Sequence, residues 1–283
     1  MIISKLKGGL GNQMFQYAIG RQLSLLNKDN LFLDKEALLN NTNLIYTKRD
    51  YELNIFKLSS KDLNFNNLTK FINKIKQKIK PLKIIIESSS EYNKSILKHT
   101  GNLLLDGYWQ SEKYFKNIEY QIREDFAFKN KPNEINANIL EKIRQSNSIS
   151  LHIRRGDYVY NLNTNKVHGI CSTEYYDQGI SIIQSKVSNP QFFIFSDDIE
   201  WVKKNHRFNS EPDYIDFNKG KDSFEDMRLM SNCKHCIIAN STFSWWAAWL
   251  NTNPEKIVIA PKKWFNDATI NTQDLIPETW IKI

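Results

Sequence analysis

Two adjacent arginines follow a run of strand-forming residues in the middle of the chain. The run Ser148–Ile153 reads SISLHI, and Arg154 and Arg155 come directly after it. Because side chains alternate along a strand, His152 and Arg154 should share one face, with Arg155 on the other. A guanidinium can hold a phosphate through two parallel hydrogen bonds, which makes Arg154 the candidate phosphate ligand. We expect Asp157 to neutralise Arg155 in a structural ion pair.

A second candidate phosphate site follows the strand-like run His235–Ala239. Four residues, Ser241, Thr242, Phe243 and Ser244, stand there before an aromatic helix. Ser and Thr are common N-cap residues, so one interpretation is purely structural. The exposed amides of a helix N-terminus also bind pyrophosphate, which is the functional interpretation.

Asp226 lies on the helix predicted before that strand. Its carboxylate could accept hydrogen bonds from the ring nitrogens of a base, or it could be an ordinary surface group.

A glycine-rich loop separates the first predicted strand from the first predicted helix. It reads Gly8-Gly9-Leu10-Gly11-Asn12-Gln13, and such loops allow a ligand to approach the backbone closely. With Asp34 about 20 residues further on, the pattern suggests an NAD-dependent oxidoreductase as an alternative function. Met14 stands where the third glycine of that fingerprint belongs, which weakens this alternative.

Two further patterns could ligate a metal ion. Asp197 and Asp198 could bind a divalent ion together with a sugar nucleotide, although acidic residues also favour helix starts. Cys233, His235 and Cys236 are too few for zinc, which takes about four ligands. We therefore expect no metal at the cysteines, while both interpretations of the aspartate pair stay open.

The elements that position these residues form a regular pattern after about residue 146. Strand-like runs alternate with helical segments, which predicts parallel β-α-β units and a doubly wound sheet. We expect two α/β halves, residues 1–145 and 146–283, with the last residues free to pack back on the first half. Ligands of such sheets usually bind in the crevice at the strand ends, here in a cleft between the halves.

Composition excludes several classes of protein. The 283 residues are 41% hydrophobic and 25% charged, which argues against disorder, and no apolar run is long enough to span a membrane. The net charge of +8 favours phosphate ligands, so a non-catalytic polyanion-binding protein is a third alternative. The basic stretch Lys70–Lys83 surrounds an apolar stripe and could contact an anionic membrane or be a solvated helix. Three cysteines favour reduced thiols, hence the cytoplasm or the inner face of its membrane.

Five segments in order resemble the bacterial α-1,2-fucosyltransferases of glycosyltransferase family 11. They are GGLGNQMFQYA, GYWQSEKYF, HIRRGDYV, FSDDIEW and LMSNCKHCIIANSTFSWWAAWL. The resemblance implies a GT-B-like fold with two Rossmann-type halves facing across a cleft. It also implies inverting transfer of fucose from GDP-β-L-fucose to O2 of a galactose-terminated glycan, such as O-antigen, without a metal and without nucleic acid as a partner.

The resemblance also implies roles for individual residues. Arg154 should hold the diphosphate, while His152 and Asp226 line the guanine site. The segment 241–244 should contact the phosphates, and Gly11, Asn12 and Gln13 should approach the fucose or the acceptor. Inversion needs a base that takes the acceptor proton. His168 is the candidate, with Glu112 and Asp157 as rivals.

Overall fold

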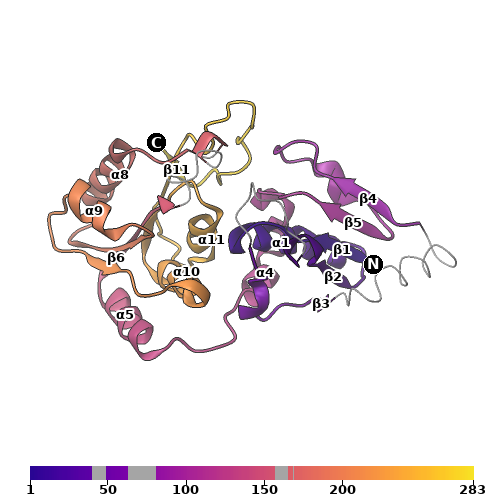
Figure 1. Ribbon diagram of the computed structural model, residues 1–283, viewed down its shortest axis with the longest axis horizontal. Coiled ribbons are helices and arrows are strands. Elements are labelled where there is room, and N and C mark those ends of the chain that lie inside the picture. The colour runs from indigo at the N-terminus through magenta and orange to yellow at the C-terminus, as the bar shows by residue number, and fades with distance from the viewer. Residues whose placement is uncertain (40–48, 63–80, 157–164, 168) are drawn as a thin grey trace. The chain divides into compact units, whose positions relative to one another are not determined.

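The computed structural model describes residues 1–39, 49–62, 81–156, 165–167 and 169–283 (Figure 1). Residues 70–80 of the basic stretch Lys70–Lys83 lie outside this range, as do Asp157 and His168. No described helix is long and apolar enough to cross a membrane.

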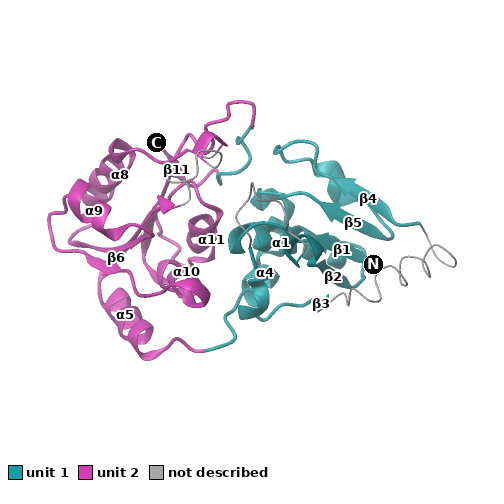
Figure 2. Ribbon diagram, in the orientation of Figure 1, with its two compact units in different colours: residues 1–130, 271–277 teal, residues 131–270, 278–283 magenta. Residues whose placement is uncertain are grey.

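The chain divides into two compact units (Figure 2). Unit 1 comprises residues 1–130 and 271–277, and unit 2 comprises residues 131–270 and 278–283. The division falls earlier than the expected residue 145 because the helix α5, Glu134–Gln145, belongs to unit 2. Lys142 on this helix donates to Asp213 of unit 2 at 3.0 Å.

Unit 1 is built on a parallel five-stranded sheet in the order β3-β2-β1-β5-β4. The strands are β1 (Ile2–Lys5), β2 (Leu31–Asp34), β3 (Lys61–Asp62), β4 (Lys83–Ile86) and β5 (Leu103–Asp106). The central strand β1 begins with fully buried isoleucines, as expected of a strand covered on both faces. The helices are α1 (Leu10–Leu26), α2 (Glu36–Leu39) and α4 (Glu119–Asp125).

A short segment from near the C-terminus also belongs to unit 1. Asp274 accepts hydrogen bonds from the Tyr92 backbone at 2.9 Å and from the Lys113 ammonium at 2.6 Å. These bonds hold the segment 271–277 against the loop that follows β4.

Unit 2 is built on a parallel six-stranded sheet in the order β11-β10-β9-β6-β7-β8. The strands are β6 (Asn147–Ile153), β7 (Pro190–Ser196), β8 (Asp213–Ile215), β9 (His235–Ile237), β10 (Val258–Ala260) and β11 (Ile281–Lys282). Besides α5, the helices are α8 (Thr173–Lys186), α9 (Ile199–Asn205), α10 (Phe224–Asn232) and α11 (Thr242–Leu250). Numbered from β6, the order is 3-2-1-4-5-6, the order of dinucleotide-binding sheets. The expected α/β class with two Rossmann-type halves is confirmed.

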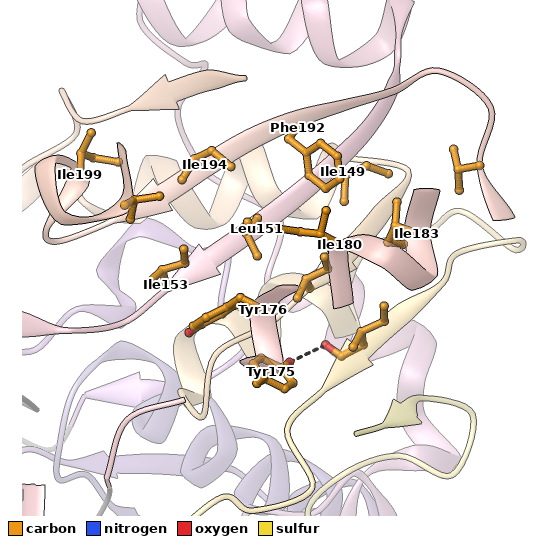
Figure 3. Close-up of a cluster of buried hydrophobic side chains, with 14 residues drawn as sticks. Ile149, Leu151, Ile153, Tyr175, Tyr176, Ile180, Ile183, Phe192, Ile194 and Ile199 are labelled. Carbon is orange, nitrogen blue, oxygen red and sulfur yellow. Dashed lines mark hydrogen bonds between the residues drawn. The ribbon is translucent and has the colours of Figure 1, made fainter. Parts of the chain in front are cut away.

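The two faces of β6 have different surroundings. Ile149, Leu151 and Ile153 join α8 in a buried hydrophobic cluster, shown in Figure 3. The hydroxyl of Tyr175, on α8, donates to the backbone carbonyls of Ile238 and Ile259 at 2.6 and 3.2 Å and ties the helix to the sheet. His152, on the opposite face of β6, has its ring centroid 6.1 Å from that of Phe243 on α11.

Candidate functional site

The strand order of unit 2 locates a ligand crevice. From β6 the chain continues to β7 and β8 on one side, and β9 lies on the other, so the order reverses between β6 and β9. Open α/β sheets bind ligands at this switch point, outside the carboxyl ends of the strands. Leu151 pairs with Ile237, which places the segment after β6 beside the segment after β9. Arg154 and the start of α11 are therefore neighbours at the position where a ligand is expected.

Asp197 holds the guanidinium of Arg154. The Nη1 of Arg154 lies 2.8 Å from Asp197 Oδ2, and both side chains keep 27% of their surface exposed. Asp197 Oδ1 accepts the backbone N–H of Arg155 at 2.8 Å. A Cβ at Gly156 would collide with the same carboxylate, so a glycine allows this close approach. The Arg154 side chain is thus oriented by a carboxylate from the loop after β7 and remains partly exposed, so a ligand can still reach it.

Arg155 points away from that ligand position. Its Nε lies 3.2 Å from Asp198 Oδ2, and its guanidinium stacks 3.8 Å from the centre of the Trp201 ring. The expected partner Asp157 lies outside the described residues, so that pairing stays a prediction.

Both carboxylates of the suspected metal pair are engaged by protein groups. Arg154 pairs with Asp197, and Asp198 contacts Arg155 and caps α9 by accepting the Trp201 N–H at 3.1 Å. Among the described residues, no group of three or more His, Cys, Asp or Glu side chains is arranged to hold a metal ion. Cys233 and Cys236 are free, buried thiols.

His152 is a neutral side chain at the end of β6. Burial, together with the nearby charge of Arg154, lowers its pKa to about 3. Its Nδ1 is buried and has no hydrogen-bond partner among the described residues. At physiological pH the imidazole therefore adds no positive charge beside Arg154, and it is too weakly basic to take a proton from an alcohol.

The first turn of α11 differs from those of α5, α8 and α9, and like that of α10 it has no side-chain cap among the described residues. Asn133, Ser172 and Asp198 cap α5, α8 and α9 by accepting a first-turn N–H, whereas the Ser241 side chain makes no such bond among the described residues. The buried Ser244 hydroxyl donates back to the Ser241 carbonyl at 3.2 Å. Ser241, Thr242 and Phe243 are half-buried, so the amides of this turn remain available to an anion.

Asn240, whose importance the sequence did not indicate, fixes the loop before α8 to this helix start. Its buried amide donates to the Gly169 and Trp264 carbonyls at 3.3 and 3.1 Å. Its Oδ1 accepts the Cys171 thiol at 3.5 Å. The three contacts bring together segments that lie far apart in the sequence.

Asp226 is a half-buried carboxyl in the first turn of α10. Its Oδ1 accepts the Asn218 amide at 2.9 Å. Its pKa is raised to about 7, mainly by burial and also by the charge of Glu225, while the Asn218 hydrogen bond opposes the shift. Near neutral pH the carboxyl can therefore either carry a proton or, in its ionised form, accept a hydrogen bond from a ligand.

The glycine loop of unit 1 is filled by protein groups. The Leu10 N–H, at the start of α1, donates to Glu52 Oε2 at 3.0 Å. The buried Gln13 amide donates to the Gly8 and Asp50 carbonyls at 2.9 and 2.8 Å and accepts the Glu52 N–H at 3.0 Å. A dinucleotide pyrophosphate at this helix would meet the Glu52 carboxylate, which disfavours the NAD alternative. Asp34 is buried and caps the following turn by accepting the Glu36 N–H at 2.9 Å.

Asn12 is half-buried, as are Gly8 and Gly9 of the same loop. It lies at the switch point of the unit 1 sheet, between β1 and β5. Gln110, after β5, donates to its Oδ1 at 2.9 Å, and the neighbouring Tyr108 is 41% exposed. Gly11, in contrast, is buried. Asn12, Gln110 and Tyr108 therefore form a small polar and aromatic group at the carboxyl edge of this sheet.

Of the three candidate bases, the described residues include Glu112 alone. His168 and Asp157 lie outside the described residues. Glu112 belongs to unit 1 and lies 3.4 Å from the Lys116 ammonium. The assignment of the base stays a prediction.

Comparisons with known proteins give a consistent result. A family model described as Glycosyl transferase family 11 matches residues 1–283. The chain is 41% identical to an Escherichia coli alpha-1,2-colitosyltransferase, with 100% of this chain and 99% of the relative covered. It is 34% identical to the Escherichia coli O-antigen biosynthesis glycosyltransferase WbnK, with 99% of each chain covered. The fucosyltransferase NodZ from Bradyrhizobium superposes with a TM-score of 0.49 at 13% identity, over 87% of this chain and 91% of that one.

Proposed function

We propose that this chain, which belongs to glycosyl transferase family 11, transfers L-fucose from GDP-β-L-fucose to O2 of a galactoside, with inversion. The product would be a cell-surface glycan such as O-antigen, in line with the name of the relative WbnK. The observation that carries the proposal is the placement of Arg154 beside the open first turn of α11. Both lie at the switch point of a sheet with dinucleotide-binding strand order.

The donor nucleotide is held by unit 2. Arg154, the Ser241 hydroxyl and the amides of residues 242–244 bind the diphosphate, because a guanidinium and a helix N-terminus both favour negative charge, whereas the Ser241 N–H already donates to the Ala239 carbonyl. Asp226 accepts hydrogen bonds from the N–H groups on the pairing edge of guanine. His152, neutral and packed near Phe243, lines the same base.

These groups assist the chemical step by stabilising the leaving group. As the bond between the fucose C1 and the phosphate oxygen breaks, positive charge develops on the sugar and negative charge on GDP. A fixed guanidinium and helix amides stabilise that negative charge, and removal of one such donor typically costs ~10²–10³ in rate. The acceptor O2 forms its bond to C1 from the opposite face and gives its proton to a base, for which His168 is the candidate.

The acceptor galactoside is held by unit 1. Asn12, fixed by Gln110, offers a planar amide to sugar hydroxyls, and Tyr108 offers an exposed ring for apolar faces of the sugar. Gly11 and Gln13 shape the loop that carries Asn12 and do not bind the sugar through their side chains. Gly11 is buried, and the Gln13 amide bonds to protein atoms.

A second donor is favoured by one relative. The name of the colitosyltransferase indicates colitose, which is L-fucose without its 3-hydroxyl, as the alternative sugar. The test is incubation with GDP-fucose or GDP-colitose and a panel of β-galactosides, with product linkage read by NMR. We expect α-1,2 fucosylated product from the wild type and none from Arg154→Ala. Transfer from GDP-colitose alone would assign the other donor, and no transfer from either would refute the proposal.

A further inference from the structure

We infer that Asn136 and Asn218 are positioning residues: their paired amides fix which oxygen of Asp226 is left for the donor base. This inference rests on the proposed contact between Asp226 and guanine. Neither asparagine belongs to the segments that resemble the fucosyltransferases, and Asn136 lies on α5, far from Asp226 in the sequence.

The two amides bond to each other in both directions. Asn136 Nδ2 donates to Asn218 Oδ1 at 2.9 Å, and Asn218 Nδ2 donates to Asn136 Oδ1 at 2.9 Å. Asn136 is fully buried and Asn218 is 8% exposed, so water does not replace these bonds readily. A rotation of either amide by 180° would set oxygen against oxygen and N–H against N–H, which fixes the orientation of both.

The remaining protons of the pair are also used. Asn136 Nδ2 donates to Asn133 Oδ1 at 3.0 Å, and Asn218 Nδ2 donates to Asp226 Oδ1 at 2.9 Å. Because its orientation is fixed, Asn218 can present only a donor to Asp226. Oδ1 is thereby committed as an acceptor, and a proton on the neutral carboxyl must reside on Oδ2. The same Oδ2 is the oxygen left for an N–H of the base.

The charged groups around Asp226 do not determine which of its two oxygens carries the proton. Glu225 raises the pKa of Asp226 but is itself bound by Arg228 at 2.7 and 3.2 Å. The packed helix α11 carries no charged residue. The charged residues of α5 and of the connection between β8 and α10 are exposed: Glu134, Glu141, Lys142, Arg144, Asp216, Lys219, Lys221 and Asp222.

The experiment compares Asn218→Ala with Asn133→Ala. Asn133 is the matched control, because it lies at the other end of the hydrogen-bonded series Asn133, Asn136, Asn218 and Asp226. In each background, the melting temperature is measured against pH with and without Asp226→Asn, which gives the titration midpoint of Asp226 in the free protein. The affinity for GDP is measured by calorimetry over the same pH range.

We expect Asn218→Ala to raise the midpoint by about one pH unit, because a hydrogen bond to the charged form is lost. GDP binding at pH 7 should weaken about fivefold, because a shift of one unit from about 7 lowers the ionised fraction of Asp226 from about a half to about a tenth. Asn133→Ala should lower the melting temperature without moving the midpoint. Asn136→Ala keeps the Asn218 amide but removes the partner that fixes its orientation, so the midpoint should shift less, in the same direction.

An unmoved midpoint in both Asn218→Ala and Asn136→Ala would overturn the inference. A moved midpoint together with unchanged GDP affinity in Asp226→Asn would show that the pair controls the titration of Asp226. It would remove the proposed contact between Asp226 and guanine, and with it the inferred role of the pair in donor binding.

Discussion

Replacement of Asp226 by Asn should stabilise the protein above neutral pH while it weakens the binding of GDP. Burial raises the pKa of this carboxyl from 3.8 to about 7, so the folded protein holds its proton more tightly than the unfolded chain does. At 1.36 kcal/mol per pKa unit, the ionised group costs roughly 4 kcal/mol of stability. Asn is isosteric, and its Oδ1 can still accept from Asn218.

The sign of the pH dependence follows from the raised pKa. The contribution of neutral Asp226 to stability is fully present below pH 3.8 and is lost as pH rises through about 7. The wild type should therefore lose stability relative to Asp226→Asn over this range, and the gap should reach its maximum above pH 8.

Denaturant unfolding of both proteins at pH 5 and at pH 8.5 measures the gap. Calorimetry with GDP should show weaker binding by the variant, because an amide whose Oδ1 still accepts from Asn218 presents N–H groups to the base in place of the Oδ2 acceptor. A stability difference that does not change with pH would refute the assignment of a buried, protonated carboxyl at this position.

Three further outcomes are expected. Arg154→Lys should lower turnover ~10²-fold or more, because an ammonium cannot form the two parallel hydrogen bonds of a guanidinium. A near-normal kcat would contradict the proposed role of these two bonds. Tyr108→Ala should raise KM for the galactoside and leave the Kd for GDP unchanged, whereas a weaker GDP complex would place the donor in unit 1. Glu87→Gln should lower the free energy of unfolding by ~1–3 kcal/mol, because the two carboxylate oxygens accept the Tyr108 and Trp109 N–H groups at 2.5 and 2.8 Å. Glu200→Gln, at an exposed position, is the control and should change the free energy of unfolding little in denaturant titrations.

The elements of unit 2 could be predicted from the sequence because their periodicities are strong. The run SISLHI is strand β6, and its alternation placed His152 opposite the cluster that contains Ile153. The aromatic helix expected after the run His235–Ala239 is α11, Thr242–Leu250. The strands β3 and β4 could not be predicted from alternation because they are only two and four residues long.

The partners of the site residues could not be predicted because they come from distant parts of the chain. Asp197 reaches Arg154 since β7 runs parallel beside β6, a pairing that only the sheet order reveals. Asn136 and Asn218 stand 82 positions apart and carry no motif. Glu52 blocks the start of α1 from a segment that has no signature of its own.

The most direct test of the account is a crystal structure of the protein with GDP. We predict density for the diphosphate within hydrogen-bond distance of the Arg154 guanidinium and of the first-turn amides of α11, with the base beside Asp226. A diphosphate bound instead at the glycine loop of unit 1, in place of the Glu52 carboxylate, would contradict it.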